Sequence, residues 1–207
     1  MGLYNTKGLY NSYDRNHAER DKLDYYATPP GETLNILKTL GYDFSDCTIL
    51  EPSCGGGHMA KDIYEYCNDT TTITCTDIHE QEQIFEYPHF TGEEYDFLAD
   101  DYPIDTADWI IMNPPYATIE PFVIRALEIA DKGVIMLARL QFLEGKKRFE
   151  NILSTNPPTD IYVYVDRIQC WKAGIKPTGS SSQAYAWFVW RKTENNEFPQ
   201  VHWMKRI

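Results

Sequence analysis

A chain of 207 residues with 43% apolar residues is long enough for one domain with a full hydrophobic core, and it contains neither a signal-peptide h-region nor an apolar run that could span a bilayer. We therefore expect a cytoplasmic protein without membrane contacts. Five cysteines, an odd number without a CxxC pair, argue against a zinc site and a disulfide framework, and we expect no metal. The net charge of −12 argues against a general nucleic-acid binder, which usually carries a basic surface.

The predicted elements alternate between helices and strands along the chain. Residues 1–22 lack apolar periodicity and are expected to form a mobile arm ahead of one domain over residues 23–207. Leucine and isoleucine at helical spacing predict a first helix that ends at Gly41, because glycine favours the left-handed helix cap. Strands are then predicted at 48–51, 72–76, 95–98, 108–112, 133–138, 161–165 and 185–190, and helices at 58–67, 120–131 and 144–153.

This alternation predicts an α/β fold in which helices cover both faces of a mainly parallel sheet. The last two predicted strands are joined by a loop, and we expect them to pair antiparallel as a hairpin at one edge of the sheet.

The most informative stretch begins at Asp108, where an apolar run ends in Asn113-Pro114-Pro115-Tyr116. Proline has no N–H to donate, so the two prolines stop the strand, and the polar residues lie at its carboxyl end, where open α/β sheets bind ligands. There an amide oxygen and a proline carbonyl can both accept hydrogen bonds from one exocyclic amino group, while the tyrosine ring stacks on its base. Alone, such a motif is equally consistent with a plain proline turn.

The segment after the first predicted strand is rich in glycine. Gly55, Gly57 and Ala60 fit the G-x-G-x-x-G/A dinucleotide fingerprint, in which glycines let the backbone approach a ligand at a helix N-terminus. Asp77 lies 20 residues beyond Gly57, where an acid is expected to meet ribose hydroxyls. The pattern predicts a nucleoside-like ligand but does not separate NAD from S-adenosylmethionine.

Four blocks in this order resemble the amino-group DNA methyltransferases of the N6-adenine type, including small forms from phages and other mobile elements. The blocks are Tyr26-Ala27-Thr28-Pro29-Pro30, Glu51-Pro52-Ser53-x-Gly55-x-Gly57, Asp77 and Asn113–Tyr116. In the family they close over the methionine end of the cofactor, form the cofactor loop, bind the ribose and hold the target base. A fifth block, Asp96-Phe97-Leu98, resembles the one that contacts the cofactor's adenine. The resemblance covers residues 24–140 well and the remainder loosely.

The resemblance implies a Rossmann-like class I methyltransferase that uses S-adenosylmethionine to methylate N6 of a flipped adenine in DNA. The implied catalytic residues are Asn113, Pro114, Pro115 and Tyr116. The implied cofactor-binding residues are Tyr26, Thr28, Pro29, Glu51, Pro52, Ser53, Gly55, Gly57, Asp77, Asp96 and Phe97. Cytosine N4 is the second target, whereas cytosine C5 methylation is disfavoured, because it usually needs a Pro-Cys nucleophile and no cysteine here follows a proline.

The charge distribution weakens the argument that overall acidity makes against nucleic-acid binding. Residues 1–138 hold 8 Lys/Arg and 25 Asp/Glu, a net of −17, whereas residues 139–192 hold 9 and 4, a net of +5. We therefore expect DNA to contact residues 139–183, although a solvated helix face is the ordinary explanation of such a run. The candidate substrate-binding residues are Lys146, Lys147, Arg148, Lys172, Lys176 and Trp187. Trp187 would form an aromatic wall for the base, although its segment equally suits a core strand.

Three other functions remain open. A protein glutamine N5-methyltransferase presents a similar amide nitrogen to the same tetrapeptide, and the acidic charge favours it. RNA guanine N2 methylation is another possible reaction. A non-catalytic binding module with a methyltransferase fold is a different class, and the intact tetrapeptide and glycine loop argue against it. The Thr28-Pro29 block and the Glu51-Pro52-Ser53 opening favour DNA.

Overall fold

The computed structural model describes residues 25–79, 84, 94–179, 183–194 and 198–206. The expected mobile arm at residues 1–22 lies outside the described residues, as do residues 180–182 of the expected substrate-contacting segment. In the described part, none of the helices combines the length and the apolar character needed to cross a bilayer.

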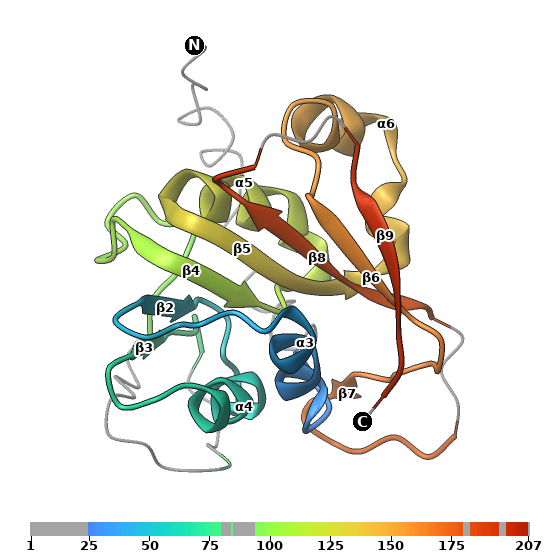
Figure 1. Ribbon diagram of the computed structural model, residues 1–207, viewed down its shortest axis with the longest axis horizontal. Helices are drawn as coiled ribbons and strands as arrows, with labels where there is room; N and C mark the ends of the chain where they lie inside the picture. The colour runs from blue at the N-terminus through green and yellow to red at the C-terminus, as the bar shows by residue number, and fades with distance from the viewer. Residues whose placement is uncertain (1–24, 80–83, 85–93, 180–182, 195–197, 207) are drawn as a thin grey trace.

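Seven strands form one twisted sheet in the order β3-β2-β4-β5-β8-β6-β9 (Figure 1). The strands are β2 (Thr48–Glu51), β3 (Thr72–Cys75), β4 (Ala107–Met112), β5 (Ala130–Arg139), β6 (Asp160–Tyr164), β8 (Tyr185–Arg191) and β9 (Gln200–Met204). Strands β3, β2, β4 and β5 are parallel neighbours, and β6 and β9 are parallel to each other. Only β8 runs antiparallel to its two neighbours in this sheet. The mainly parallel α/β fold is therefore confirmed.

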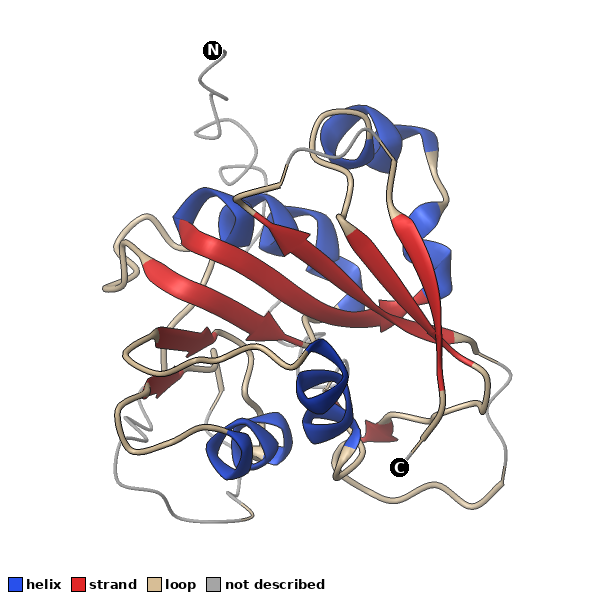
Figure 2. Ribbon diagram, viewed as in Figure 1, coloured by secondary structure: helices blue, strands red, loops and turns tan. Residues whose placement is uncertain are grey.

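Helices cover both faces of the sheet, as Figure 2 shows. The helical segments are α3 (Glu32–Leu40), α4 (His58–Tyr66), η2 (Tyr116–Thr118), α5 (Ile119–Ile129), η3 (Leu140–Leu143), α6 (Lys146–Arg148) and the π-helical η4 (Phe149–Leu153). Buried side chains of α3 and α4 pack on one face, and those of α5, η3 and η4 pack on the other. Burial of apolar surface in these two layers holds the sheet in place.

A carboxylate joins α3 to α4. Gly31 begins α3 without a side-chain cap, and Asp62 of α4 supplies the missing acceptors. Its Oδ1 accepts the N–H of Gly31 at 3.2 Å, and its Oδ2 accepts those of Thr33 and Leu34 at 3.1 and 3.2 Å. Burial raises the pKa of Asp62, although these bonds oppose the shift. The two helices follow the two segments expected to hold the cofactor, so this cap positions those segments relative to each other. At its other end, α3 stops at the left-handed Gly41, as predicted.

Three predicted elements differ from the structure. Residues 95–98 form no strand; a single parallel bridge joins Asp77 to Glu94 instead, and a turn follows at once. The predicted helix at 144–153 has three α-helical residues and then becomes π-helical. The predicted antiparallel hairpin does not lie at the edge, because β8 is inserted between β5 and β6. Six residues of β8 are buried in succession, which suits a strand covered on both faces.

Two short strands form a separate pair beneath the sheet in Figure 1. Strand β1 (Tyr26–Ala27) pairs antiparallel with β7 (Trp171–Lys172), so the pair joins segments that lie far apart in the sequence. None of β1, β7 and β9 was predicted. Two-residue strands have no periodicity to detect, and β9 buries only Met204 among its five residues.

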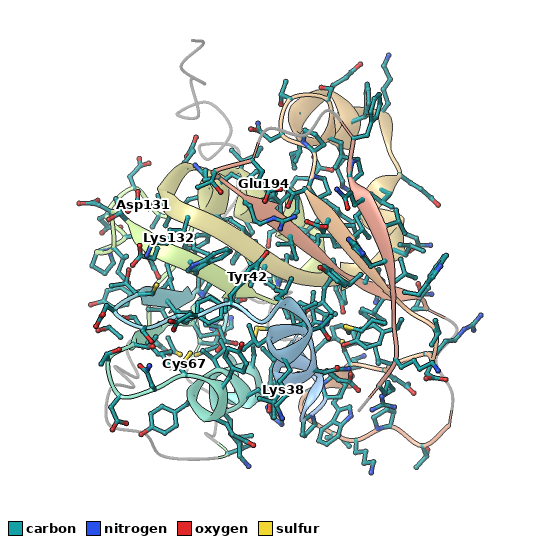
Figure 3. The ribbon with its side chains drawn as sticks, viewed as in Figure 1. Lys38, Tyr42, Cys67, Asp131, Lys132 and Glu194 are labelled. Atoms are coloured by element: carbon teal, nitrogen blue, oxygen red, sulfur yellow. The ribbon has the colours of Figure 1, made fainter. Side chains whose placement is uncertain are left out.

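Polar side chains close the edge of the sheet at the amino ends of β4 and β5. Figure 3 labels Asp131 and Lys132 there. Lys132 Nζ lies 3.0 Å from Asp108 Oδ1 and 3.2 Å from Cys47 Sγ. Slight burial opposes ionisation of Asp108, but hydrogen bonds from the Thr48 N–H and then from Lys132 hold its pKa below the usual range. The opposite edge, at the carboxyl ends of these strands, carries the candidate site.

Candidate active site

The site forms where β2, β4 and β5 end, and Asn113 lies at its centre. The Nδ2 amide of Asn113 donates to the carbonyl of Tyr26 at 2.7 Å and to Thr28 Oγ1 at 3.2 Å. This orientation turns Oδ1 away from β1, and within the described residues neither Oδ1 nor the Pro114 carbonyl accepts a hydrogen bond. Asn113 is partly buried. Two acceptor oxygens from adjacent residues are therefore available together at the end of β4.

Tyr116 is fixed beside them by its hydroxyl. The hydroxyls of Tyr116 and Tyr185 lie 2.9 Å apart, and the buried thiol of Cys170 lies near both. Burial raises the pKa of Tyr116, and it raises that of Cys170 to about 12, so both groups remain protonated at neutral pH. The ring of Tyr26 lies 5.3 Å from the ring of Tyr116, centroid to centroid. The aromatic-x-Thr-Pro block and the tetrapeptide therefore meet in the structure.

The glycine loop lies next to this pair. Gly55 and Gly57 have φ values of +50° and +79°, a backbone region that other residues rarely adopt. Ser53 Oγ donates to the carbonyl of Asn113 at 3.3 Å, which links the loop to β4. The Gly55 N–H donates to Asp77 Oδ2 at 2.8 Å, so the predicted ribose acid also holds the loop. The structure thus brings the four sequence blocks together at one edge of the sheet.

Sequence reasoning missed the role of Tyr25, which covers the glycine loop. Its hydroxyl accepts the Gly56 N–H at 2.9 Å. A Cβ built on Gly55 would lie 2.3 Å from Tyr25 Cε2, so this glycine is required by the approach of a side chain. The carbonyl of Tyr25 accepts the N–H of Ala173, in the turn after β7. Ala173 has a φ of +51°, which costs about 1 kcal/mol for a residue with a Cβ. Backbone strain is therefore placed in the segment that holds Tyr25.

Two acids, the buried Glu51 and the partly buried Asp77, support the loop. The pKa of Asp77 is raised by burial, although its bonds from the Gly55 and His79 amides oppose the shift. Each of its oxygens accepts one recorded bond and keeps a second lone pair. Glu51 is only 1% exposed, and its pKa lies well above the ordinary 4.5, first because of burial and then because of the nearby Asp77. Glu51 and Pro52 are both buried, so they support the loop from below.

Replacing Glu51 by glutamine is expected to stabilise the protein at neutral pH. Because the folded-state pKa of Glu51 is raised, its favourable contribution is complete below pH 4.5 and is lost as the pH rises through the folded-state value. Each unit of pKa difference corresponds to about 1.4 kcal/mol. Thermal unfolding from pH 4 to 9 should show melting temperatures that diverge with rising pH, the variant being higher. Glu65→Gln on the exposed face of α4 is the control, and parallel curves for parent and Glu51→Gln would contradict the prediction.

Two predicted site residues lie in the core. Phe97 is 1% exposed, and its ring contacts those of Tyr102 and Phe122. Trp187 is fully buried, and its Nε1 donates to the hydroxyl of Tyr164 at 2.7 Å. Trp187 therefore forms part of the core and not a wall for a base, as the alternative reading of its strand allowed. The neighbouring Asp96 is exposed and accepts the Leu98 N–H within a turn.

The predicted basic run divides into two kinds of residue. Lys146 and Lys147 are exposed. Arg148 instead donates to the carbonyls of Gln141, Phe142 and Glu144 and forms an ion pair with Glu120 at 3.3 Å. Its guanidinium is therefore committed to the fold, which corrects the expectation of a free cation. The ion pair brings α6 to the first turn of α5, directly after Tyr116.

The other predicted cations belong to the segment beside β1. Lys172 lies in β7, opposite Tyr26, and Lys176 follows in the turn; both are exposed. Trp171 packs its ring edge-to-face on that of His58, the first residue of α4, at 5.8 Å. The segment from β7 onward is thus held over the glycine loop and near the tetrapeptide. Residues 139–183 also contribute Phe142, Ile152, Ile161, Ile168 and Cys170 to the core.

No protein-family model and no curated protein matches the chain. Solved structures do resemble it. The methyltransferase subunit of a type I restriction-modification system from Streptococcus thermophilus matches with a TM-score of 0.64 and 13% identity, over 87% of this chain and 47% of that one. A modification subunit of a putative type I restriction enzyme from Vibrio vulnificus YJ016 matches with 0.58 and 12%, over 99% and 53%. A putative RNA methyltransferase from Pyrococcus horikoshii matches with 0.55 and 18%, over 83% and 89%.

The chain has a methyltransferase fold. It spans about half the length of the two restriction-modification subunits. At 12 to 18% identity these similarities establish the architecture and not the substrate, since one fold supports many reactions.

Proposed function

We propose that the protein transfers a methyl group from S-adenosylmethionine to the N6 amino group of adenine in DNA. One observation carries the proposal: Asn113 donates its Nδ2 to the Tyr26 carbonyl and to Thr28 Oγ1, which leaves Oδ1 and the Pro114 carbonyl without a donor among the described residues. An exocyclic amino group has two N–H bonds, and these two oxygens are a matched pair of acceptors for them. Hydride transfer by a dehydrogenase does not require such a pair of acceptor oxygens.

The two acceptors would act by orienting the amino nitrogen. The lone pair of adenine N6 is delocalised into the ring, so the nitrogen is a poor nucleophile in its planar form. Hydrogen bonds to Asn113 Oδ1 and the Pro114 carbonyl would hold the nitrogen out of that plane and direct its lone pair toward the methyl donor. Positioning and electrostatics then supply most of the catalysis, and the proton leaves to solvent afterwards. No covalent enzyme nucleophile is required.

The residues of the glycine loop fit S-adenosylmethionine. Asp77 keeps lone pairs that can accept from ribose hydroxyls, and the loop offers backbone close to the ligand without Cβ atoms at Gly55 and Gly57. Tyr26, Thr28 and Pro29 would close the methionine end, and Asp96 lies past the bridge to Asp77, where the cofactor's adenine is expected. The cofactor would supply an activated methyl group. Its binding requires Tyr25 and the loop to accommodate it, because Tyr25 now contacts both Gly55 and Gly56.

DNA is favoured over the other substrates by the position of the basic segment. The exposed Lys146 and Lys147 belong to α6, which the Arg148–Glu120 pair joins to α5, and the exposed Lys172 belongs to β7, which pairs with β1. The target base must leave the helix to reach Asn113, at a cost of a few kcal/mol that hydrogen bonding and stacking offset. Two of the similar structures are named as restriction-modification subunits, which agrees with a DNA substrate at the level of fold analogy only.

The deciding experiment offers labelled S-adenosylmethionine with duplex DNA, single-stranded DNA, RNA and protein, side by side. Label in DNA, released as N6-methyladenine after digestion to nucleosides, supports the proposal; N4-methylcytosine would change the base but keep the mechanism. Label only in protein glutamine or only in RNA would replace the proposal, and no transfer to any acceptor would favour a binding module.

Replacing Asp77 by alanine is expected to weaken S-adenosylmethionine binding by roughly 1–3 kcal/mol, because a buried acceptor of hydroxyl groups is lost and the Gly55 N–H loses its partner. Calorimetric titration with S-adenosylhomocysteine measures the change. Asp43→Ala, on an exposed turn with Ser45, is the matched control. If calorimetry of the parent detects NAD and neither adenosyl compound, the cofactor assignment is wrong.

A further inference from the structure

Arg139 is the last residue of β5, next to the end of β4, and its guanidinium lies against the tyrosines of the site. Its Cζ lies 4.1 Å from the ring centroid of Tyr116 and 5.9 Å from that of Tyr26. The guanidinium also lies near the hydroxyl of Tyr185, with which it interacts electrostatically. Arg139 therefore stacks on the ring that the proposed reaction needs for its target base.

The charge of Arg139 has no acidic counterpart in the described part of the chain. Its neighbours there are the hydroxyl groups of Tyr116, Tyr185 and Tyr26 and the thiol of Cys170. Arg148, Arg191 and Arg206 are paired with Glu120, Asp160 and Glu32, whereas Arg125, like Arg139, lies against aromatic rings. A partly buried cation without a carboxylate loses solvation that ring contacts only partly replace.

The stacking of Arg139 on Tyr116 and its charge without an acidic partner both point to a nucleotide as the ligand. A guanidinium stacks on aromatic rings as a nucleobase does, and its planar set of donors matches the oxygens of a phosphate. We propose that Arg139 stacks on Tyr116 at the position that the target base would take and, when the base binds there, turns to bind a backbone phosphate of the same strand. The inference rests on the proposed function and adds a substrate requirement to it.

This arrangement would select the class of substrate. A nucleotide brings an aromatic ring to replace the guanidinium on Tyr116 and an anion to receive it. A glutamine side chain in a protein brings the amide but neither of these groups. Arg139 would thus favour polynucleotides over protein substrates at a site whose acceptors, Asn113 and Pro114, fit both.

The test compares Arg139→Gln and Arg139→Lys with the parent chain. Binding to mixed-sequence DNA, single-stranded and duplex, is measured over a series of salt concentrations, and S-adenosylhomocysteine affinity is measured separately. For Arg139→Gln we expect roughly tenfold weaker DNA binding at low salt and a salt slope for duplex lower by about 0.9, the value for one phosphate contact. Arg139→Lys should keep the parent's slope, because its charge remains, while binding less tightly. Cofactor affinity should not change.

Lys192→Gln is the control, since this exposed lysine follows β8 at the opposite edge of the sheet. Melting curves of all variants show whether each is folded before binding is compared, and Arg139→Lys keeps the comparison valid if Arg139→Gln is not. An unchanged salt slope in folded Arg139→Gln overturns the inference. Loss of cofactor affinity with an unchanged slope also overturns it and assigns Arg139 to the methionine carboxylate.

The methylation assay separates this inference from the proposed function. If the parent methylates adenine in DNA while Arg139→Gln keeps the parent's slope, only the phosphate contact is wrong. If the parent transfers no methyl group to DNA although its slope depends on Arg139, the proposed function is wrong and the phosphate contact stands.

Discussion

Replacing Asn113 by alanine is expected to reduce methyl transfer at least about 10²–10³-fold, the usual cost of removing one oriented hydrogen-bonding group from an active site. The variant loses the Oδ1 acceptor that would orient the amino nitrogen. S-Adenosylmethionine affinity should remain nearly unchanged, because the glycine loop and Asp77 supply most of the proposed cofactor contacts and Asn113 only supports Tyr26 and Thr28. Single-turnover transfer to DNA and calorimetric titration measure the two quantities independently.

A second Asn-Pro-Pro sequence provides the control. Asn156 precedes Pro157 and Pro158, lies exposed after η4, and has no contact with the candidate site. Asn156→Ala should therefore keep full activity. Asn113→Ala also removes the donors to Tyr26 and Thr28, so a stability loss of about 1 kcal/mol for each bond is expected from melting curves. If cofactor binding disappears while the variant remains folded, Asn113 faces the cofactor and the proposed mechanism is wrong.

The site was predictable where single residues impose local backbone structure. Pro114 and Pro115 end β4 because they cannot extend its ladder, so Asn113 must lie at a carboxyl edge. Gly55 and Gly57 mark a tight loop, and both have positive φ. Parallel strands bring their carboxyl ends to one edge, and this alone gathers segments that lie far apart in the sequence.

The sequence predictions that were wrong or missing depend on tertiary contacts that no local pattern encodes. The position of β8 depends on which strands flank it, so the sequence alone could not assign Trp187 to an aromatic wall or to the core. Arg148 carries the charge expected of a DNA contact, yet its guanidinium donates to three backbone carbonyls and is paired with Glu120. Tyr25 and Arg139 gain their roles from neighbours more than 20 residues away. Charge and periodicity specify residue type and spacing, whereas partners follow from the tertiary fold.

Replacing Gly133 by alanine is expected to destabilise the protein by at least about 3 kcal/mol. Backbone propensity alone predicts the opposite sign, since alanine is favoured over glycine inside a strand by roughly 0.5–1 kcal/mol and Gly133 has no positive φ. At Gly133 the steric clash outweighs this difference in backbone propensity. A Cβ on Gly133 would lie 2.3 Å from the carbonyl oxygen of Trp190 and 2.5 Å from Cζ3 of Trp109. The Trp190 carbonyl is backbone of β8, paired with β5, so it cannot move aside without disturbing the ladder.

Gly41→Ala separates this steric effect from conformational strain. Gly41 has a φ of +63°, and a Cβ there would meet nothing within 4 Å, so its replacement should cost only about 1–2 kcal/mol. Urea unfolding of both variants gives the order directly, with the Gly133 variant the less stable. At roughly 2–4 °C per kcal/mol for a chain of this size, its melting temperature should fall by about 6–12 °C or more. A Gly133 variant as stable as the parent would mean that the Trp109 ring and β8 can move apart, and that the sheet packing described around β5 is incorrect.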